Sequence, residues 1–331
     1  MKEKGAALIV VLSFLVLVGM ISSTIVTISQ KSARKIKVET DRAISSYLAE
    51  GAISRLLWLM MSDLQKNTTR NVANRFDKSS SDSSTSKYVA TGRPISIHYY
   101  DTKITARIFD MASGFNISGS SGAQALQALI QAYSMSPAIV TSIKVFMDRF
   151  SDYINSGLGG RSANGMNKDD YTSMGLSPLP RNDQLEYKDE VLWIPGAGDI
   201  FTPNQFGRLS ELNIIPPHGM YFYANKINFF SADKAMIMAQ CNFNADEANA
   251  IIQGRDNWLK GDSNLSIYNF IDTNYMMKLT QQFSFQDSGY YTLVISASQG
   301  EGYYERMMIV SLKIGTTISD NGIQYYEYLV Y

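Results

Sequence analysis

Four aspartates in the middle of the chain are the residues whose type and spacing best fit the binding of a hard metal ion. Asp148 and Asp152 lie one helical turn apart, and Asp169 and Asp170 follow in a stretch rich in Gly, Asn and Asp. Carboxylate oxygens on a loop are ligands that Ca²⁺ prefers, but the spacing of an EF-hand loop is absent. Calcium is therefore the one cofactor that the sequence suggests, and solvated acidic side chains are the alternative.

Other catalytic chemistry has no matching pattern. Cys241 is the only cysteine, and the only histidines, His98 and His218, lie far apart, so the ligands of a zinc site are lacking. No strand–turn–helix places a Gly-x-Ser-x-Gly nucleophile near a histidine. The glycine-rich residues 157–165 lack the preceding strand and the lysine of a phosphate-binding loop. We therefore predict that the chain is not an enzyme.

The Gly-x-Gly turn in residues 193–198 raises the question of nucleic-acid binding, because such a turn can present backbone amides to a phosphate. Acidic residues surround it, namely Glu186, Asp189, Glu190 and Asp199. Phosphate binding depends on an excess of cations, whereas 30 Lys and Arg balance 30 Asp and Glu in the whole chain. We predict a structural turn and no nucleic-acid partner.

The peptide bond between Gly5 and Ala6 separates a charged leader from 23 residues, 6–28, that carry no charge. A membrane-spanning helix needs roughly 20 apolar residues. Three interpretations remain open: a cleavable secretory signal, an uncleaved signal anchor, and a prepilin-like leader cut after Gly5. The length of the apolar run and the poor cleavage site after it count against the first, because a secretory signal has an apolar core of only about 7–15 residues.

The charges that flank this segment do not favour the prepilin-like interpretation. The leader contains two lysines, whereas four positive residues follow the apolar run, at Lys31, Arg34, Lys35 and Lys37. Because positive residues are enriched in cytoplasmic loops, this count favours an N-terminus outside the cytoplasm. A prepilin-like leader requires the opposite orientation.

The sequence also predicts the secondary-structure elements that hold these residues in place, beginning with the segment after the apolar run. Apolar positions recur every three or four residues between Val38 and Leu64, at Ile44, Tyr47, Leu48, Ala52, Leu56, Met60 and Leu64. This spacing is typical of one buried helical stripe. Residues 6–64 contain no proline and two glycines. They form either a membrane helix followed by a separate core helix, or one continuous rod.

Strand patterns occur in two blocks, 93–109 and 283–331. The first is a hairpin with alternating apolar residues and a turn near residues 101–103. The second contains strands at 290–298 and 303–313, then a turn at Asn321-Gly322 and a closing strand to Tyr331. Tyrosines are frequent in this block, which indicates either ordinary half-exposed strands or a face that contacts other proteins.

The region between the two blocks is mainly helical. Ser136-Pro137 opens a helix to Ile154, Ser231 caps a helix over 232–240, and a capping box at Asn244 opens a third helix that Gly254 ends. Residues 79–86 and 158–177 are predicted loops.

These elements predict an α+β fold. A long N-terminal helix packs on an antiparallel sheet, and a mainly helical domain is inserted between the early and the late strands. The predicted organisation is a leader (1–5), a transmembrane and pilin-type long helix (6–66), a β domain (67–109 with 283–331) and the inserted helical domain (110–282).

Seven segments follow one another in an order that matches a known family. They are the Gly5–Ala6 junction, Phe109–Ile117, Phe146–Asp148, Asp169–Tyr171, Leu179–Asn182, Phe206–Leu212 and Ile227–Ala232. Together they resemble general secretion pathway protein K, the large minor pseudopilin of bacterial type II secretion. The chain departs from the family in the Asp148–Asp152 run and at Phe230, which leaves open the calcium that is associated with the family's helical domain.

The resemblance implies a pilin-like subunit in the bacterial inner membrane, with a single span and its head in the periplasm. It implies that prepilin peptidase cuts between Gly5 and Ala6 and that Ala6 is then N-methylated. It also implies several partners: minor pseudopilins of the I, J and H types, the major pseudopilin, the inner-membrane secretion platform and exported substrates. A minor pilin of a type IV pilus and a membrane-anchored periplasmic binding protein are the alternatives.

Val10 stands where most pilin-like proteins resemble one another in a glutamate, at the fifth position after the cut. In such filaments that carboxylate is thought to meet the N-terminal amine of a neighbouring subunit. A buried carboxylate without a partner is costly. Our hypothesis is that Val10 suits a subunit at the filament tip, which has no preceding neighbour.

Overall fold

The structure is a computed structural model, and the statements below concern the residues that it describes: 2–66, 70–76, 88–100, 102–117, 137–155, 162–185, 188–201, 203, 209, 212–213, 226–260, 265–298, 305–315 and 322–331. The predicted loop at 79–86 and most of Phe206–Leu212 lie outside these residues.

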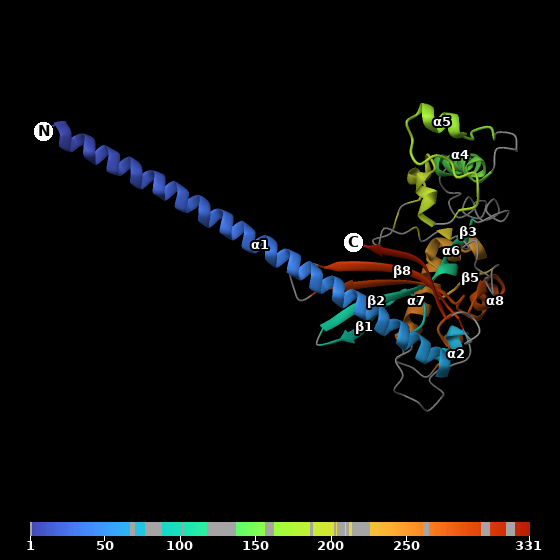
Figure 1. Cartoon of the computed structure of the whole chain (residues 1–331). Coiled ribbons are helices and arrows are strands. Elements are labelled where there is room, and N and C mark those ends of the chain that lie inside the picture. The colour runs from blue at the N-terminus through green and yellow to red at the C-terminus, as the bar shows by residue number, and fades with distance from the viewer. Residues whose placement is uncertain are drawn as a thin grey trace.

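One helix, α1 (Lys2–Lys66), forms the whole N-terminal part of the protein. Its 65 residues correspond to a rod of about 97 Å at 1.5 Å per residue. Figure 1 shows that the first half of α1 extends away from the rest of the molecule, while the second half lies along the sheet. Of the two alternatives, the continuous rod is therefore correct.

The second half of α1 is held by the predicted apolar stripe. Leu48, Ala52, Leu56 and Met60 are buried against the sheet. Tyr47 was placed on the same stripe, and that placement is wrong, because its side chain is 57% exposed on the outer side of the helix. At 100° per residue, Tyr47 lies roughly 160° from the middle of the arc formed by residues 48, 52, 56 and 60, so its side chain faces away from the sheet.

The sheet has five antiparallel strands in the order β1-β2-β7-β8-β9. Their bounds are β1 (Pro94–Tyr99), β2 (Thr102–Asp110), β7 (Tyr290–Ala297), β8 (Arg306–Ile314) and β9 (Ile323–Val330). The β1–β2 hairpin is confirmed, with Ile97 paired to Ile104. The late strands are confirmed as well, and β2 pairs with β7 across almost two hundred residues of sequence.

Further helices lie between β2 and β7, and the α+β fold class is confirmed. They are α4 (Pro137–Ile154), α5 (Lys168–Ser173), α6 (Lys234–Cys241), α7 (Ala245–Leu259) and α8 (Thr273–Gln282), with 3₁₀ turns η1 (Met111–Ser113), η3 (Lys188–Trp193), η4 (Ala197–Asp199) and η5 (Ile267–Asn269). A short helix, α2 (Val72–Phe76), follows α1. Two-residue strands form the parallel pairs β3 (Phe115–Asn116) with β4 (Leu212–Asn213) and β5 (Ile227–Asn228) with β6 (Phe283–Ser284).

Three local predictions in this region were wrong. The cap of α6 is Asp233, whose side chain accepts from the Met236 amide, whereas Ser231 bonds elsewhere. The capping box at Asn244 is confirmed, but α7 continues past Gly254 to Leu259. Gly254 is needed there because a Cβ would lie 2.3 Å from the Phe270 carbonyl oxygen. The predicted loop at 158–177 contains α5.

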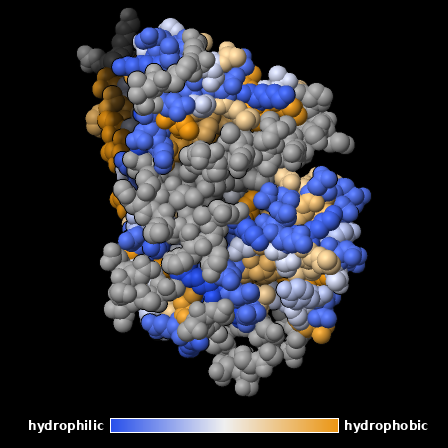
Figure 2. All heavy atoms as spheres, turned by 90° about the vertical axis from the view of Figure 1, so that its right-hand side faces the viewer, coloured by the Kyte–Doolittle hydropathy of each residue, from blue (hydrophilic) through white to orange (hydrophobic). Residues whose placement is uncertain are grey.

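The buried apolar side chains form two clusters rather than one. The first joins the second half of α1 to one face of the five-stranded sheet. The second gathers side chains from α4 to α8 and the turns between them, with Phe146, Phe201, Phe229 and Trp258 among its largest members. Figure 2 shows the face of this helical region that points away from α1, on which hydrophilic side chains predominate among the residues coloured.

Candidate functional site

The first half of α1 carries the predicted processing and tip residues. Gly5 and Ala6 lie within the helix, and only their backbone is described. Val10 is described fully and is 68% exposed. By length and composition, α1 contains one stretch that could cross a membrane, and none of that stretch is buried in the head. The apolar surface of this half therefore needs lipid or other helices to cover it.

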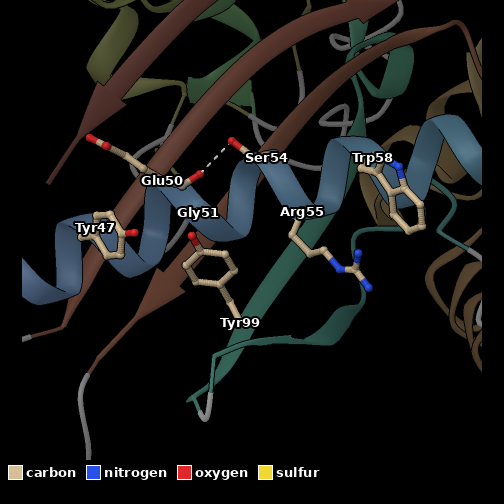
Figure 3. A pocket seen from close by; sticks show the side chains of 7 residues that line it. All are labelled: Tyr47, Glu50, Gly51, Ser54, Arg55, Trp58 and Tyr99. Carbon is tan, nitrogen blue, oxygen red and sulfur yellow. Dashed lines mark hydrogen bonds between the residues drawn. The ribbon is translucent and has the colours of Figure 1, made fainter.

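A shallow groove lies on the outer side of the second half of α1, beside the end of β1. Its volume is about 420 Å³, and it is lined by Tyr47, Glu50, Gly51, Ser54, Arg55, Trp58 and Tyr99. Figure 3 shows that Tyr99 reaches from β1 towards Gly51, while the other side chains come from α1. A Cβ on Gly51 would lie 2.1 Å from the Tyr99 ring, so the glycine is what lets the ring lie on the helix.

Two tyrosines, Tyr47 and Tyr99, form one end of the groove, and Tyr100 packs against Tyr99 beside it. The ring centroids of Tyr47 and Tyr99 are 6.4 Å apart, and those of Tyr99 and Tyr100 are 4.8 Å apart in an edge-to-face arrangement. Tyr100 is 72% exposed and adopts a positive φ of 48° at the tip of the β1–β2 hairpin. Aromatic rings in contact with one another and with water are typical of surfaces that bind proteins.

The other end of the groove is formed by Arg55 and Trp58, one turn apart on α1. The guanidinium carbon of Arg55 lies 4.7 Å from the centroid of the Trp58 ring, within the range of a cation–π interaction. Trp58 is 57% exposed. Among the described residues Arg55 has no ion-pair partner. Trp, Tyr and Arg are the residues that most often dominate the energy of protein interfaces.

The late tyrosines divide into two kinds. Tyr290 and Tyr291 are fully buried, whereas Tyr325 and Tyr328 on β9 are about half exposed. Tyr328 lies close enough to Glu50 of α1 for that carboxylate to contribute to a raised pKa of the phenol, after the larger effect of burial. Half-exposed strand positions are thus confirmed for Tyr325 and Tyr328 but not for Tyr290 and Tyr291, and contact with other proteins stays a prediction.

The head end of α1 is fixed by a buried ionic group. Arg75 of α2 donates to Asp63 of α1 and, at 2.9 Å, to Asp287 just before β7. The side chains of all three residues are at least 95% buried. The Tyr291 hydroxyl donates to the other Asp287 oxygen at 2.7 Å. This group ties α1, α2 and β7 together, and removal of one member leaves an unpaired buried charge.

A second buried carboxylate, Asp110 at the end of β2, joins the sheet to the helical region. Its oxygens accept four hydrogen bonds, from the Ala112 amide, the Asn228 side chain, and both the amide and the hydroxyl of Ser288, at 2.6–2.8 Å. Its amide donates to the Ser231 hydroxyl, which donates to Ala90. Residues in two segments of the family resemblance, 109–117 and 227–232, thus meet at this point.

Burial governs the protonation of these acidic groups. The pKa of Asp110 is raised to about 6, because desolvation and the charge of Asp287 outweigh the donors from Ser288 and Ala112. Desolvation also raises the pKa of Asp287, although Arg75 opposes the shift. The pKa of Tyr291 is raised well above its ordinary value by burial and by Asp287. Asp110, Asp287 and Tyr291 are all buried, as is typical of groups that stabilise a fold.

The four predicted calcium ligands do not meet in one group. Asp148 accepts from the amide and the side chain of Asn164, and Asp152 accepts from the amide and the hydroxyl of Ser162. Asp170 completes the capping box of α5 with Asn167, and Asp169 lies in the same first turn. No group of three or more His, Cys, Asp or Glu in the described part of the chain is arranged to hold a metal ion. Calcium binding stays a prediction.

The turn at residues 193–198 joins the 3₁₀ segments η3 and η4. Gly196 adopts a φ of 87°, and Arg149 of α4 donates to the Pro195 carbonyl at 2.8 Å. Trp193 is 47% exposed beside it. The contact attaches the turn to α4, as expected of a structural element.

Comparison with solved structures gives an informative likeness. No protein-family model matches the sequence, and no curated protein matches it. A chain in the crystal structure of the GspK-GspI-GspJ complex from the type 2 secretion system of enterotoxigenic Escherichia coli is similar in fold, with a TM-score of 0.53 and 13% sequence identity. The match covers 90% of this chain and 99% of that chain. At this level of identity the likeness establishes a shared fold.

Proposed function

We propose that this protein is a minor pseudopilin at the tip of a type II secretion pseudopilus, where it helps to initiate filament assembly and the export of folded proteins. In this proposal α1 anchors it in the bacterial inner membrane and the head lies in the periplasm. The proposal is supported above all by α1. Its first half is apolar and is not buried in the head, while its second half packs on the sheet.

The fold likeness supports the same role, because the similar chain belongs to a complex of GspK, GspI and GspJ. We propose that smaller minor pseudopilins of the I, J and H types pack their long helices beside α1, and that the major pseudopilin follows. The groove offers such a helix a surface lined by Tyr47, Trp58 and Tyr99. We propose that residues 110–282 form an inserted domain; in Figure 1 the helices between β2 and β7 lie away from the first half of α1.

The N-terminus of the protein extracted from membranes tests the proposal most directly. If prepilin peptidase cuts between Gly5 and Ala6, mass spectrometry will find an N-methylated Ala6 as the first residue. A protein that keeps Met1 is an uncleaved anchor, and a protein that begins near Ser32 has lost a secretory signal. Either result would overturn the proposal.

Val10 tests the tip position separately. Val10→Glu introduces a carboxylate into the bilayer, at a cost below the roughly 2.5–3.5 kcal/mol that insertion scales give for Asp at the centre of a span. A subunit added first has no neighbouring amine to pair with it. We therefore expect impaired initiation of assembly, measured as secretion and as recovery of the minor pseudopilin complex, with Val11→Glu as the matched control for insertion alone. Unchanged secretion and complex recovery in Val10→Glu would contradict the tip position.

A further inference from the structure

Three cations just beyond the apolar segment share one face of α1. Lys31, Arg34 and Lys35 are all exposed, and at 100° per residue their positions fall within an arc of about 100°. Residues 31 and 35 are separated by only about 6 Å along the helix axis. The three side chains therefore form a compact cluster of positive charge, called the basic cluster below.

No acidic side chain neutralises the basic cluster within the described part of the protein. None of its three members takes part in an ion pair there. The nearest acidic residue on the same face, Glu39, lies about 6 Å further along the axis, and no ion pair joins it to Lys35. The cluster thus presents unpaired charge on a segment of α1 that nothing in the head covers.

The position of the basic cluster along α1 indicates what it meets. Residues 6–28 span about 34 Å, close to the hydrocarbon thickness of about 30 Å. The headgroup layer adds about 5–7 Å on each side. Lys31 lies about 4–5 Å beyond Ile28 and Lys35 about 10 Å beyond it, and long basic side chains can bend back towards the interface. The cluster is therefore at the depth of lipid phosphates.

We infer that Lys31, Arg34 and Lys35 form a binding site for the phosphate groups of anionic phospholipids. Clusters of Lys and Arg next to a membrane span are attracted to anionic lipid surfaces. The inference rests on the proposed function for one point, the orientation that puts the cluster on the translocated side. Positive residues there are disfavoured during insertion, and binding to headgroups offsets this cost once the helix is in place.

The test is the choice of lipid around the full chain in vesicles. The chain, with Lys2→Gln and Lys4→Gln to remove the cations of the leader, is reconstituted in phosphatidylcholine with a trace of spin-labelled phosphatidylglycerol or phosphatidylcholine. Electron paramagnetic resonance then measures the fraction of each label held at the protein. We expect phosphatidylglycerol to be preferred by about fivefold, which corresponds to the roughly 1 kcal/mol of a single cation near the surface, and the preference to weaken in 1 M salt.

The decisive variant is Lys31→Gln/Arg34→Gln/Lys35→Gln, which should bring the preference close to onefold. Lys66→Gln/Lys103→Gln/Lys144→Gln removes the same charge from exposed sites outside the apolar segment and should leave the preference unchanged. The inference is overturned if the parent chain shows no preference or if the decisive variant keeps it. A parent without lipid preference whose decisive variant loses a partner pseudopilin would assign the cluster to carboxylates of that partner.

The lipid test and the test of the proposed pseudopilin role can fail independently of each other. The lipid measurement uses the chain alone and works in either orientation, so its failure leaves the proposed pseudopilin role untouched. Conversely, a start at Met1 would overturn that role without removing the basic cluster from the membrane surface.

Discussion

Two arginines near the head end of α1 have opposite surroundings. Arg75 is buried between Asp63 and Asp287 and is part of the ionic group that ties three elements together. Arg55 is exposed, stacks on Trp58 and has no ion-pair partner in the described part of the chain. Buried charges that are fully paired fix the shape of the head, whereas exposed and unpaired ones are available to bind a partner. The comparison predicts that substitutions at the two sites affect different measurements.

The largest effect is expected at the buried site. Arg75→Met leaves the carboxylates of Asp63 and Asp287 without their cation, and we expect the free energy of unfolding to fall by about 3–5 kcal/mol. Urea unfolding of the full chain in detergent, followed by tryptophan fluorescence, measures the loss. Arg55→Met is the matched control and should change the free energy by less than about 0.5 kcal/mol. Equal losses of unfolding free energy in the two variants would show that the buried and the exposed arginine contribute alike to stability.

The second effect is a pH dependence that originates at Asp110. The folded protein keeps this proton up to about pH 6, whereas the unfolded chain releases it near pH 4. In that window the folded state binds more protons, so the free energy of unfolding falls as the pH rises. A shift of about two pKa units corresponds to about 3 kcal/mol.

Asp110→Asn removes the ionisation and should flatten this slope between pH 4 and pH 6. Urea unfolding at several pH values measures it, and Asp169→Asn, at an exposed position in α5, should keep the slope of the parent. Asp287 also has a raised pKa, so part of the slope will remain in the Asp110 variant. An unchanged slope would show that Asp110 is ionised in the folded protein throughout this range.

Sequence patterns predicted the elements well and their contacts poorly. The period-two strands and the proline-free rod were correct, because side-chain alternation and helix continuity are local properties. The ionic group was missed, because Asp63, Arg75 and Asp287 lie on three separate segments and only the tertiary fold brings them together. The prediction that Gly254 ends its helix is wrong for the same reason. A glycine that ends a helix and one that admits a neighbouring carbonyl look alike in sequence.

The groove could not be predicted from the sequence for a different reason. Its floor and one wall come from outward positions of α1, where Gly51, Arg55 and Trp58 fit any solvated helical face. Only the approach of Tyr99 from β1 distinguishes them. Of the predicted site residues, Gly5, Ala6 and Val10 depend on processing and assembly, which no intramolecular contact can reveal.

The third effect is on binding rather than on stability. If the groove receives the helix of an I-type minor pseudopilin, Trp58→Ala should weaken that complex by about 2 kcal/mol, or about thirtyfold, as expected of a central aromatic residue. Trp193→Ala removes another exposed tryptophan, in the helical region, and should leave affinity unchanged. Titration of the two purified proteins in detergent measures both. Equal effects of the two substitutions on affinity would show that the groove does not bind the partner.

The smallest expected change in stability is at Gly51. Alanine is favoured over glycine within a helix by roughly 0.5–1 kcal/mol, but its Cβ would collide with the Tyr99 ring, 2.1 Å away. That ring lies at the end of an edge strand and can rotate aside, so we expect Gly51→Ala to change the free energy of unfolding by less than about 1 kcal/mol.

Gly254→Ala is the contrasting substitution, because its Cβ meets the backbone oxygen of Phe270 rather than a movable ring. A loss of about 1–3 kcal/mol is expected there from overpacking. Gly51→Ala should nevertheless weaken the pseudopilin complex. The Tyr99 ring would move off α1, and the groove would lose the wall that this ring forms. A variant at Gly51 that binds its partner normally would show that the groove around Trp58 works without its glycine floor, and would narrow the docking surface to Arg55 and Trp58.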